Sequence, residues 1–278
     1  MNDHPARRPV TPGETVAAPP RPAPWVGTLR VIEHQAAVQR RFWRGSVFGY
    51  LLTPVLFLAA LGFGVGGLVA EGTGRVDGVD YLAFVAPALM AAAAMQTAAG
   101  ESLWPVMAGM KWLRTFHAMV ATPLRPGDVY RGIVTWTALR ATAGGLVFVA
   151  VAGALGALRS PWSPLAAGAA GLTAAAFAAP LAAFAATQET DLRFPVIMRV
   201  GIVPLFLFSG TFFPVDQLPA WIRPARFASP LWYGVELARA ATLGRWDLTL
   251  VPKAATLALG ITIAAAWGTR TFTRRLGQ

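Results

Sequence analysis

The sequence has 278 residues but no cysteine, and its only three histidines are at positions 4, 34 and 117. The absence of cysteine excludes disulfide frameworks, thiolate metal sites, iron–sulfur clusters and cysteine nucleophiles. The histidines are too far apart in sequence to indicate a metal site. Charged residues make up only 13% of the chain, whereas soluble domains carry roughly 25%. So little charge does not cover a water-facing surface, which argues against an ordinary soluble enzyme.

The sequence is rich in apolar residues, which make up 55% of the chain and are grouped in long runs. A helix that crosses a membrane needs about 20 mainly apolar residues. The runs do not alternate as the strands of a β-barrel would, and backbone inside a membrane satisfies its own hydrogen bonds as helix. The sequence therefore predicts an all-α integral membrane protein. Its six transmembrane helices are expected at about residues 46–70, 81–100, 132–157, 163–187, 196–213 and 250–269.

The distribution of Lys and Arg predicts the orientation. Six spans place both termini on one side of the membrane, and most of the 24 Lys and Arg residues fall in the segments of that side. The positive-inside rule makes this side cytoplasmic. Residues 1–24, rich in proline, are expected to form a disordered cytoplasmic tail, and residues 271–278 a cytoplasmic C-terminus. The net charge of +11 does not indicate a nucleic-acid partner, because the cations flank membrane segments.

Residues 25–45 have the periodicity of an amphipathic helix. Trp25, Leu29 and Ile32 fall on one helical arc, while most of the Arg residues of this segment fall on another. A basic helix with Trp on its apolar edge typically lies flat in the headgroup layer. The segment is therefore predicted to be an interface helix before the first span; the alternative is a plain cytoplasmic flank.

Residues 101–128, between the second and third spans, combine cations with large apolar side chains. Met110, Leu113 and Phe116 recur at three-residue spacing, as on one face of a helix. Exposed apolar residues on a cytoplasmic loop indicate a docking surface. The alternative is a surface-lying membrane helix that has no partner. Asp128 is expected to cap the start of the third span.

The segment 212–247, between the fifth and sixth spans, is rich in proline and aromatic residues. Its tryptophans suit the membrane interface, and its apolar content predicts short helices that dip back into the membrane. Ser229 and Pro230 predict the start of an amphipathic helix. Glu236 and Arg239 of that helix are three residues apart and can pair.

Two stretches carry a resemblance to a known family. They are FHAMVATPLRPGDVYRG at residues 116–132 and LFLFSGTFFPVDQLPAWIRPARFASPLWYGVELAR at residues 205–239. Through them the chain resembles the membrane subunit of ABC-2 type exporters. It is most similar to the branch of nodulation lipo-oligosaccharide permeases and antibiotic-export permeases. The resemblance covers roughly residues 25–275 and implies a six-span ABC-2 transmembrane domain over residues 46–270.

The resemblance also implies partners and sites. Two such permease subunits, identical or related, pair in the bacterial inner membrane and bind two copies of a separate ABC ATPase. The segment after the second span is similar to the coupling helix that contacts the ATPase, and loop 189–193 is a second contact. The residues this places on the coupling surface are Met110, Leu113, Arg114, Phe116, His117, Met119 and Glu189. The outer segment resembles re-entrant helices that close the exit, with Phe212, Phe213, Pro214 and Glu236 in the outer gate region.

The chain has no phosphate-binding loop of the GxxxxGK[ST] type, so ATP and Mg²⁺ are expected on the partner subunit and no cofactor on this chain. The expected activity is export of an amphiphilic substrate, such as a drug, lipid or lipo-oligosaccharide. Arg140 is the exceptional charge within a span and is a candidate functional residue by default. The alternative for Arg140 is that its side chain reaches the cytoplasmic headgroups.

Two other classes of protein compete with this interpretation. A secondary, ion-coupled multidrug transporter usually has more spans, an inverted repeat and buried ionisable groups, and no internal repeat is evident here. A membrane metalloprotease would need HExxH or a similar ligand cluster, which the sequence lacks. A serine hydrolase would need a histidine near a span, whereas His34 and His117 fall in segments predicted to be cytoplasmic.

Overall fold

The computed structural model describes residues 23–41, 55–65, 67 and 75–277, and the regular elements within these ranges are all helices. Four of the described helices are long and apolar enough to cross a membrane. They are α4 (Tyr81–Met107), which the π-helical turn η2 (Ala108–Trp112) extends, α6 (Pro126–Ala154), α7 (Leu165–Thr187) and α11 (Leu250–Leu276). They correspond to the second, third, fourth and sixth predicted spans.

The other two predicted spans have a different outcome. About half of the first, at residues 46–70, lies outside the described residues; within the described part, 55–59 are α-helical and η1 (Ala60–Val65) continues them. The fifth, expected at 196–213, is a shorter apolar helix from Phe194 to Phe208. It consists of α8 (Phe194–Val196), the π-helical turn η3 (Ile197–Ile202) and α9 (Val203–Phe208). The count of six spans therefore stays a prediction.

Two helix ends differ from their predicted positions. The second span was expected to end at Gly100, where the uncharged run ends, but α4 continues to Met107 because glutamate is a good helix former. The Glu101 carboxylate pairs with Arg140 of α6. Helix α6 begins at Pro126 rather than 132. Proline is favoured in the first turn of a helix, and the backbone N–H of Arg125 donates to the Asp128 carboxylate over 3.1 Å. Asp128 thus caps the helix start, as predicted, from its third position.

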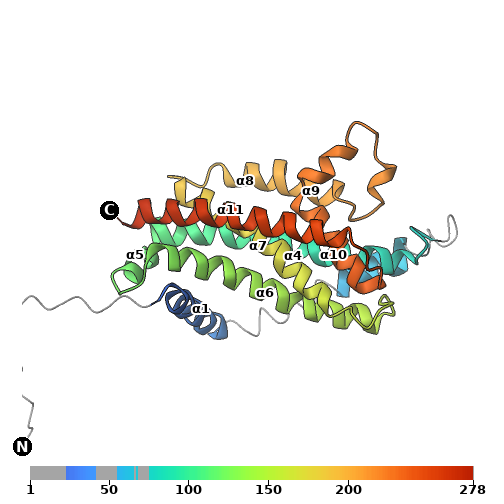
Figure 1. Ribbon diagram of the computed structural model, residues 1–278, viewed down its shortest axis with the longest axis horizontal. Coiled ribbons are helices and arrows are strands. Elements are labelled where there is room, and N and C mark those ends of the chain that lie inside the picture. Colours follow the sequence, from blue (N-terminus) through green and yellow to red (C-terminus); the bar gives the residue numbers. More distant parts are fainter. Residues whose placement is uncertain (1–22, 42–54, 66, 68–74, 278) are drawn as a thin grey trace, which may run out of the picture.

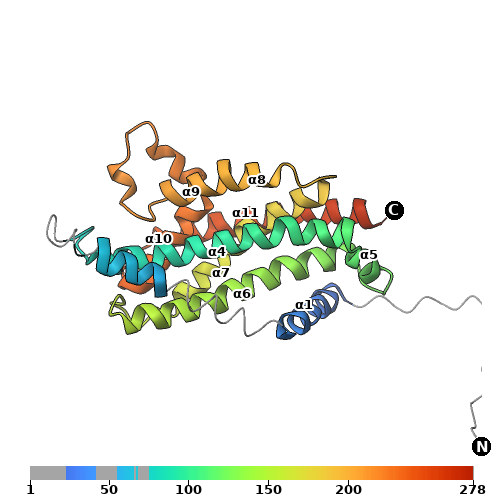
Figure 2. The same ribbon diagram turned by 180° about the vertical axis from the view of Figure 1, so that it is seen from behind.

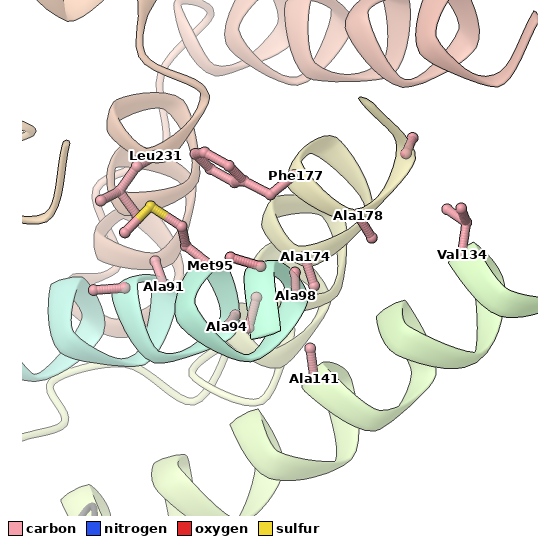
Figure 3. Close-up of a cluster of buried hydrophobic side chains, with 14 of the residues drawn as sticks. Ala91, Ala94, Met95, Ala98, Val134, Ala141, Ala174, Phe177, Ala178 and Leu231 are labelled. Carbon is pink, nitrogen blue, oxygen red and sulfur yellow. The ribbon is translucent and has the colours of Figure 1, made fainter. Parts of the chain in front are cut away.

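Helix α7 occupies the centre of the bundle and packs against α4, α6, α11 and α10 (Pro230–Leu243). Figure 1 shows α4 and α7 in the middle, with α11 on one side and α6 on the other. Alanine fills most of these contacts, as the side chains of α4, α6 and α7 show in Figure 3. Small residues let helix backbones approach closely in membranes. A Cβ on Gly145 of α6, for example, would lie 3.0 Å from the Cα of Ala167.

Helix α1 (Pro24–Arg41) lies against α6 (Figure 2). Val31 is buried there, in a space left by Gly132: a Cβ on that glycine would lie 2.5 Å from the Val31 side chain. Trp25 and Leu29 of the predicted apolar arc are exposed. The residues of the predicted interface helix beyond Arg41 lie outside the described part of the chain, as does the predicted tail up to residue 22.

The segment between α9 and α11 forms η4 (Val215–Gln217), η5 (Arg223–Ala228) and then α10. The predicted start of α10 is confirmed, because the Ser229 side chain caps the helix by accepting a hydrogen bond from the Trp232 backbone. Helix α10 packs against α7, α4 and α11, which joins this segment to the bundle.

Ion pairs tie together the loops that were predicted to share a side of the membrane. At the α10 end, Arg159 pairs with Asp80, and Arg245 contacts the Asp77 carboxylate at 2.7 Å. The opposite end holds the C-terminus and α5 (Thr115–Val120), as Figure 1 shows. The bundle therefore has two ends that match the two predicted sides.

Candidate functional site

The chain between α4 and α6 reverses direction at the end of the bundle that holds the C-terminus. Helix η2 ends at Trp112, Arg114 adopts the left-handed conformation with φ of 53°, and α5 then runs from Thr115 to Val120. A left-handed residue cannot continue a helix. The prediction that Met110, Leu113 and Phe116 share one helical face is therefore wrong.

The reversal separates the predicted docking residues into two sets. Met110 and Phe116 are buried, each with 5% of its surface exposed, whereas Leu113 is 72% exposed. Arg114 is also exposed, and so is the neighbouring Trp112, which was not among the predicted residues. The outer surface of the turn is thus formed by residues 112–114. His117 and Met119 are half-buried at its edge.

Phe116 belongs to a column of three buried aromatic rings that we call the aromatic column: Phe116, Phe272 and Tyr130. The ring of Phe272 in α11 lies 6.1 Å from that of Phe116 in α5 and 5.1 Å from that of Tyr130 in α6. Phe272 and Tyr130 are both completely buried. The column therefore connects the turn after η2 with two membrane-length helices.

Close packing and hydrogen bonds hold the aromatic column in place. The Phe116 ring lies where a Cβ on Gly109 would be, at 2.4 Å, so only glycine fits there. The Tyr130 hydroxyl lies 3.0 Å from the carbonyl oxygen of Ala179 in α7 and 3.1 Å from that of Ala264 in α11, and it donates to this pair. Tyr130 thereby joins α6, α7 and α11.

Glu189, in the turn between α7 and α8, makes a second connection at the same end. Its carboxylate accepts hydrogen bonds from Lys111 of η2 and, at 2.8 Å, from Arg275 of α11. Arg275 also donates to the carbonyl oxygen of Thr187 over 2.7 Å. The hydrogen bonds from Lys111 and Arg275 lower the pKa of the Glu189 carboxyl, which favours its ionised form. We call this three-residue contact of Lys111, Glu189 and Arg275 the carboxylate clamp.

Arg140 lies in the middle of α6, which corresponds to the predicted third span, and it forms an ion pair with Glu101 of α4. Their nearest atoms are 2.6 Å apart, and the side chains are 22% and 23% exposed. The role of Glu101 was not predicted from the sequence, because residues 101–128 were assigned to the cytoplasmic docking segment between two spans. Glu101 lies six residues before the end of α4, and an acidic residue that far inside a longer span would have suggested the pairing.

The predicted outer gate residues do not form one cluster. Phe212 packs its ring against Phe206 at 5.0 Å, whereas Phe213 contacts a small apolar cluster of Val215, Leu218 and Trp232. Pro214 precedes η4. Glu236 of α10 reaches Lys253 of α11 at 2.8 Å, closer than its predicted partner Arg239 at 3.8 Å.

Comparison with known proteins supplies the family. A family model described as "ABC-2 type transporter" matches residues 35–243, which is most of the chain. The chain belongs to the ABC-2 type transporter family. The resemblance predicted from residues 116–132 and 205–239 is thereby confirmed, and the chain is a membrane transport subunit of this family.

Individual relatives agree with the family assignment. Nodulation protein J of Rhizobium leguminosarum bv. trifolii is 34% identical over 233 residues, 83% of this chain and 87% of that protein. Nodulation protein J of Rhizobium leguminosarum bv. viciae is 31% identical, covering 81% of this chain and 85% of the relative. The protein of the same name from Sinorhizobium fredii is 32% identical, with coverage of 72% and 75%.

Proposed function

We propose that this ABC-2 transporter subunit is the permease of an ATP-driven exporter, and that it moves an amphiphilic substrate out of the cytoplasm. A separate ABC ATPase, present in two copies, supplies the energy, and a second permease subunit completes the membrane pathway. The site of action is the bacterial inner membrane, with both termini cytoplasmic. Family membership and the arrangement of the bundle end that holds the C-terminus support this proposal.

The observation that carries the proposal is the exposed turn at residues 112–114, which the aromatic column supports from inside. An exposed apolar group on such a turn favours a protein contact. Force applied there reaches α11 and α6 through Phe116 and Phe272, and the carboxylate clamp joins the same turn to the α7–α8 loop. Closure of two ATPases around ATP would shift these helices and so change which side of the membrane the pathway faces.

Leu113→Glu tests the docking role, since Leu113 is exposed and its replacement leaves the core intact. Leu248→Glu is the matched control, because Leu248 is 88% exposed at the opposite end of the bundle. Each variant is co-expressed with the ABC ATPase of the same bacterium and purified through a tag on the permease. We expect Leu113→Glu to lose most of the ATPase and Leu248→Glu to retain it. Equal recovery with both variants would contradict the docking assignment.

Phe116→Glu is unsuitable for this test. It would place a carboxylate beside Phe272 and Gly109 in the buried aromatic column. An ionised group buried without a partner is strongly unfavourable. Loss of the ATPase in that variant would therefore report misfolding.

A further inference from the structure

An apolar groove with a volume of about 500 Å³ opens on the surface of the bundle. Helix α7 contributes Ala176 and Pro180, the η5–α10 segment contributes Phe227 and Tyr233, and one face of α11 contributes residues from 256 to 267. Two hydroxyls in the wall are already hydrogen-bonded, that of Tyr233 to the Phe227 carbonyl and that of Thr256 to the Pro252 carbonyl. The wall therefore suits a hydrocarbon ligand.

The groove has the length of one membrane leaflet. Thr256, Gly260 and Trp267 recur along one face of α11, and at 1.5 Å per residue the face extends about 16 Å. The hydrocarbon core of a bilayer is about 30 Å thick, so one leaflet accounts for about half of that. The volume lies in the range of about 300–1,000 Å³ that is typical of small-molecule sites.

Gly260 forms an open part of the groove. No atom lies within 4 Å of the place where its Cβ would be, so its lack of a side chain serves no helix contact within the described chain. Gly268, two turns further along α11, is the opposite case, because the Tyr130 ring fills its space. Leu259 and Ile263 of α11 are exposed, as expected for a helix that faces lipid.

Two cations flank the end of the groove that is nearest to the start of α11. The guanidinium of Arg226 lies 4.9 Å from the centre of the Phe227 ring, and Lys253 lies one helical turn before Thr256. Both cations are over the ring of Trp232, at 5.5 and 5.2 Å. In a phospholipid, the glycerol unit joins the anionic phosphate to the acyl chains, so the phosphate lies just beyond the ends of those chains. Two cations at one end of an apolar groove match this order of groups.

The two cations at this end already have acidic partners. Arg226 pairs with Asp216 at 3.0 Å, and Lys253 pairs with Glu236 at 2.8 Å. Asp216 is 79% exposed, and an exposed pair is weak, so Arg226 can share its donors with a phosphate.

We propose that the groove binds one acyl chain of an anionic phospholipid, with the lipid phosphate at Arg226 and Lys253. The lipid comes from the leaflet at the α10 end of the bundle, which is the outer leaflet in the proposed orientation. This inference requires only that α11 faces the bilayer, and it is independent of the ATPase. Failure of the ATPase docking test would not affect the lipid-binding proposal, and failure of the lipid-binding test would not affect the docking proposal.

The test uses the full chain in nanodiscs that contain phosphatidylglycerol with a photoreactive group on its acyl chain. After irradiation, labelled peptides are mapped by mass spectrometry. We expect labelling to concentrate on the groove residues of α7, η5–α10 and α11, above that at the exposed Leu259. Even labelling of all lipid-facing positions would overturn the proposal, and so would an absence of label from the groove residues.

Variants sharpen the test. Gly260→Leu fills the groove and should reduce its labelling severalfold, whereas Ala258→Leu places the same side chain at an exposed α11 position and should not. Arg226→Gln should reduce the preference for phosphatidylglycerol over phosphatidylcholine. Its control, Arg159→Gln, removes a cation at the same end of the bundle but away from the groove. Unchanged labelling with Gly260→Leu would contradict the proposal, and the wild-type map stays decisive if that variant does not fold.

Discussion

Replacement of Gly268 by alanine tests the packing that joins α11 to α6 at the aromatic column. The new Cβ would lie 2.1 Å from Cζ of Tyr130 and 2.5 Å from its hydroxyl oxygen. The ring cannot move aside freely, because it is completely buried and its hydroxyl is held by the carbonyl oxygens of Ala179 and Ala264. The contact must be relieved by a backbone shift or by loss of these hydrogen bonds.

Three contributions determine how much Gly268→Ala changes the free energy of unfolding. Overpacking of a buried site costs about 1–3 kcal/mol, and loss of the Tyr130 hydrogen bond costs about 1 kcal/mol more. Alanine in place of glycine within a helix stabilises the folded protein by about 1 kcal/mol. Gly260→Ala in the same helix gains only the last contribution, because its Cβ would point into open space. The free energies of unfolding of the two variants should therefore differ by about 2–4 kcal/mol.

Thermal unfolding of the detergent-solubilised protein measures this difference. We expect Gly268→Ala to unfold several degrees below the wild type and Gly260→Ala at or slightly above it. The double variant Gly268→Ala with Tyr130→Phe should lose less than the sum of the two single variants, since they share one contact. Equal midpoints for Gly268→Ala and Gly260→Ala would refute the packing described for the aromatic column.

Two further predictions concern charged contacts. Glu189→Gln removes the carboxylate that Lys111 and Arg275 share, so the variant should be less stable than the wild type at neutral pH. Because the pKa of Glu189 is lowered in the folded protein, the stabilisation is present above the ordinary carboxyl pKa and is lost as the pH falls through the lowered value. Melting curves over a pH series should converge in acid; a constant gap would contradict the clamp. Glu101→Gln removes the carboxylate opposite Arg140 and should cost about 1–3 kcal/mol, less than a fully buried pair. Adding Arg140→Gln should restore part of that loss, and an additive double variant would count against the pair.

The sequence was sufficient to predict the helices whose signals are local. Apolar runs of membrane length predicted α4, α6, α7 and α11, since such runs have no other stable form in a bilayer. The cap at Ser229 and the role of Asp128 at the start of α6 were also predicted, because capping depends on residues within one turn. The two long motifs then sufficed for the family.

Contacts between distant segments could not be predicted from one sequence. The pairing of Glu101 with Arg140, and the division of Glu189 between two cations, depend on how the helices pack. The exposed or buried state of Met110 and Phe116 depends on the left-handed Arg114, a conformation that no residue pattern signalled. The three-residue spacing of Met110, Leu113 and Phe116 suggested one continuous helix face, but the helix is broken at Arg114.

The most direct test of the account is the rate of ATP hydrolysis by the partner ABC ATPase in nanodiscs, with and without this permease. We expect the permease to change that rate, and Leu113→Glu to abolish the change while Leu248→Glu preserves it. The four samples are the ATPase alone and the ATPase with the wild-type permease, with Leu113→Glu or with Leu248→Glu. If the rate of hydrolysis is the same in all four, this chain does not couple to the ATPase through the turn at residues 112–114, and the central claim fails.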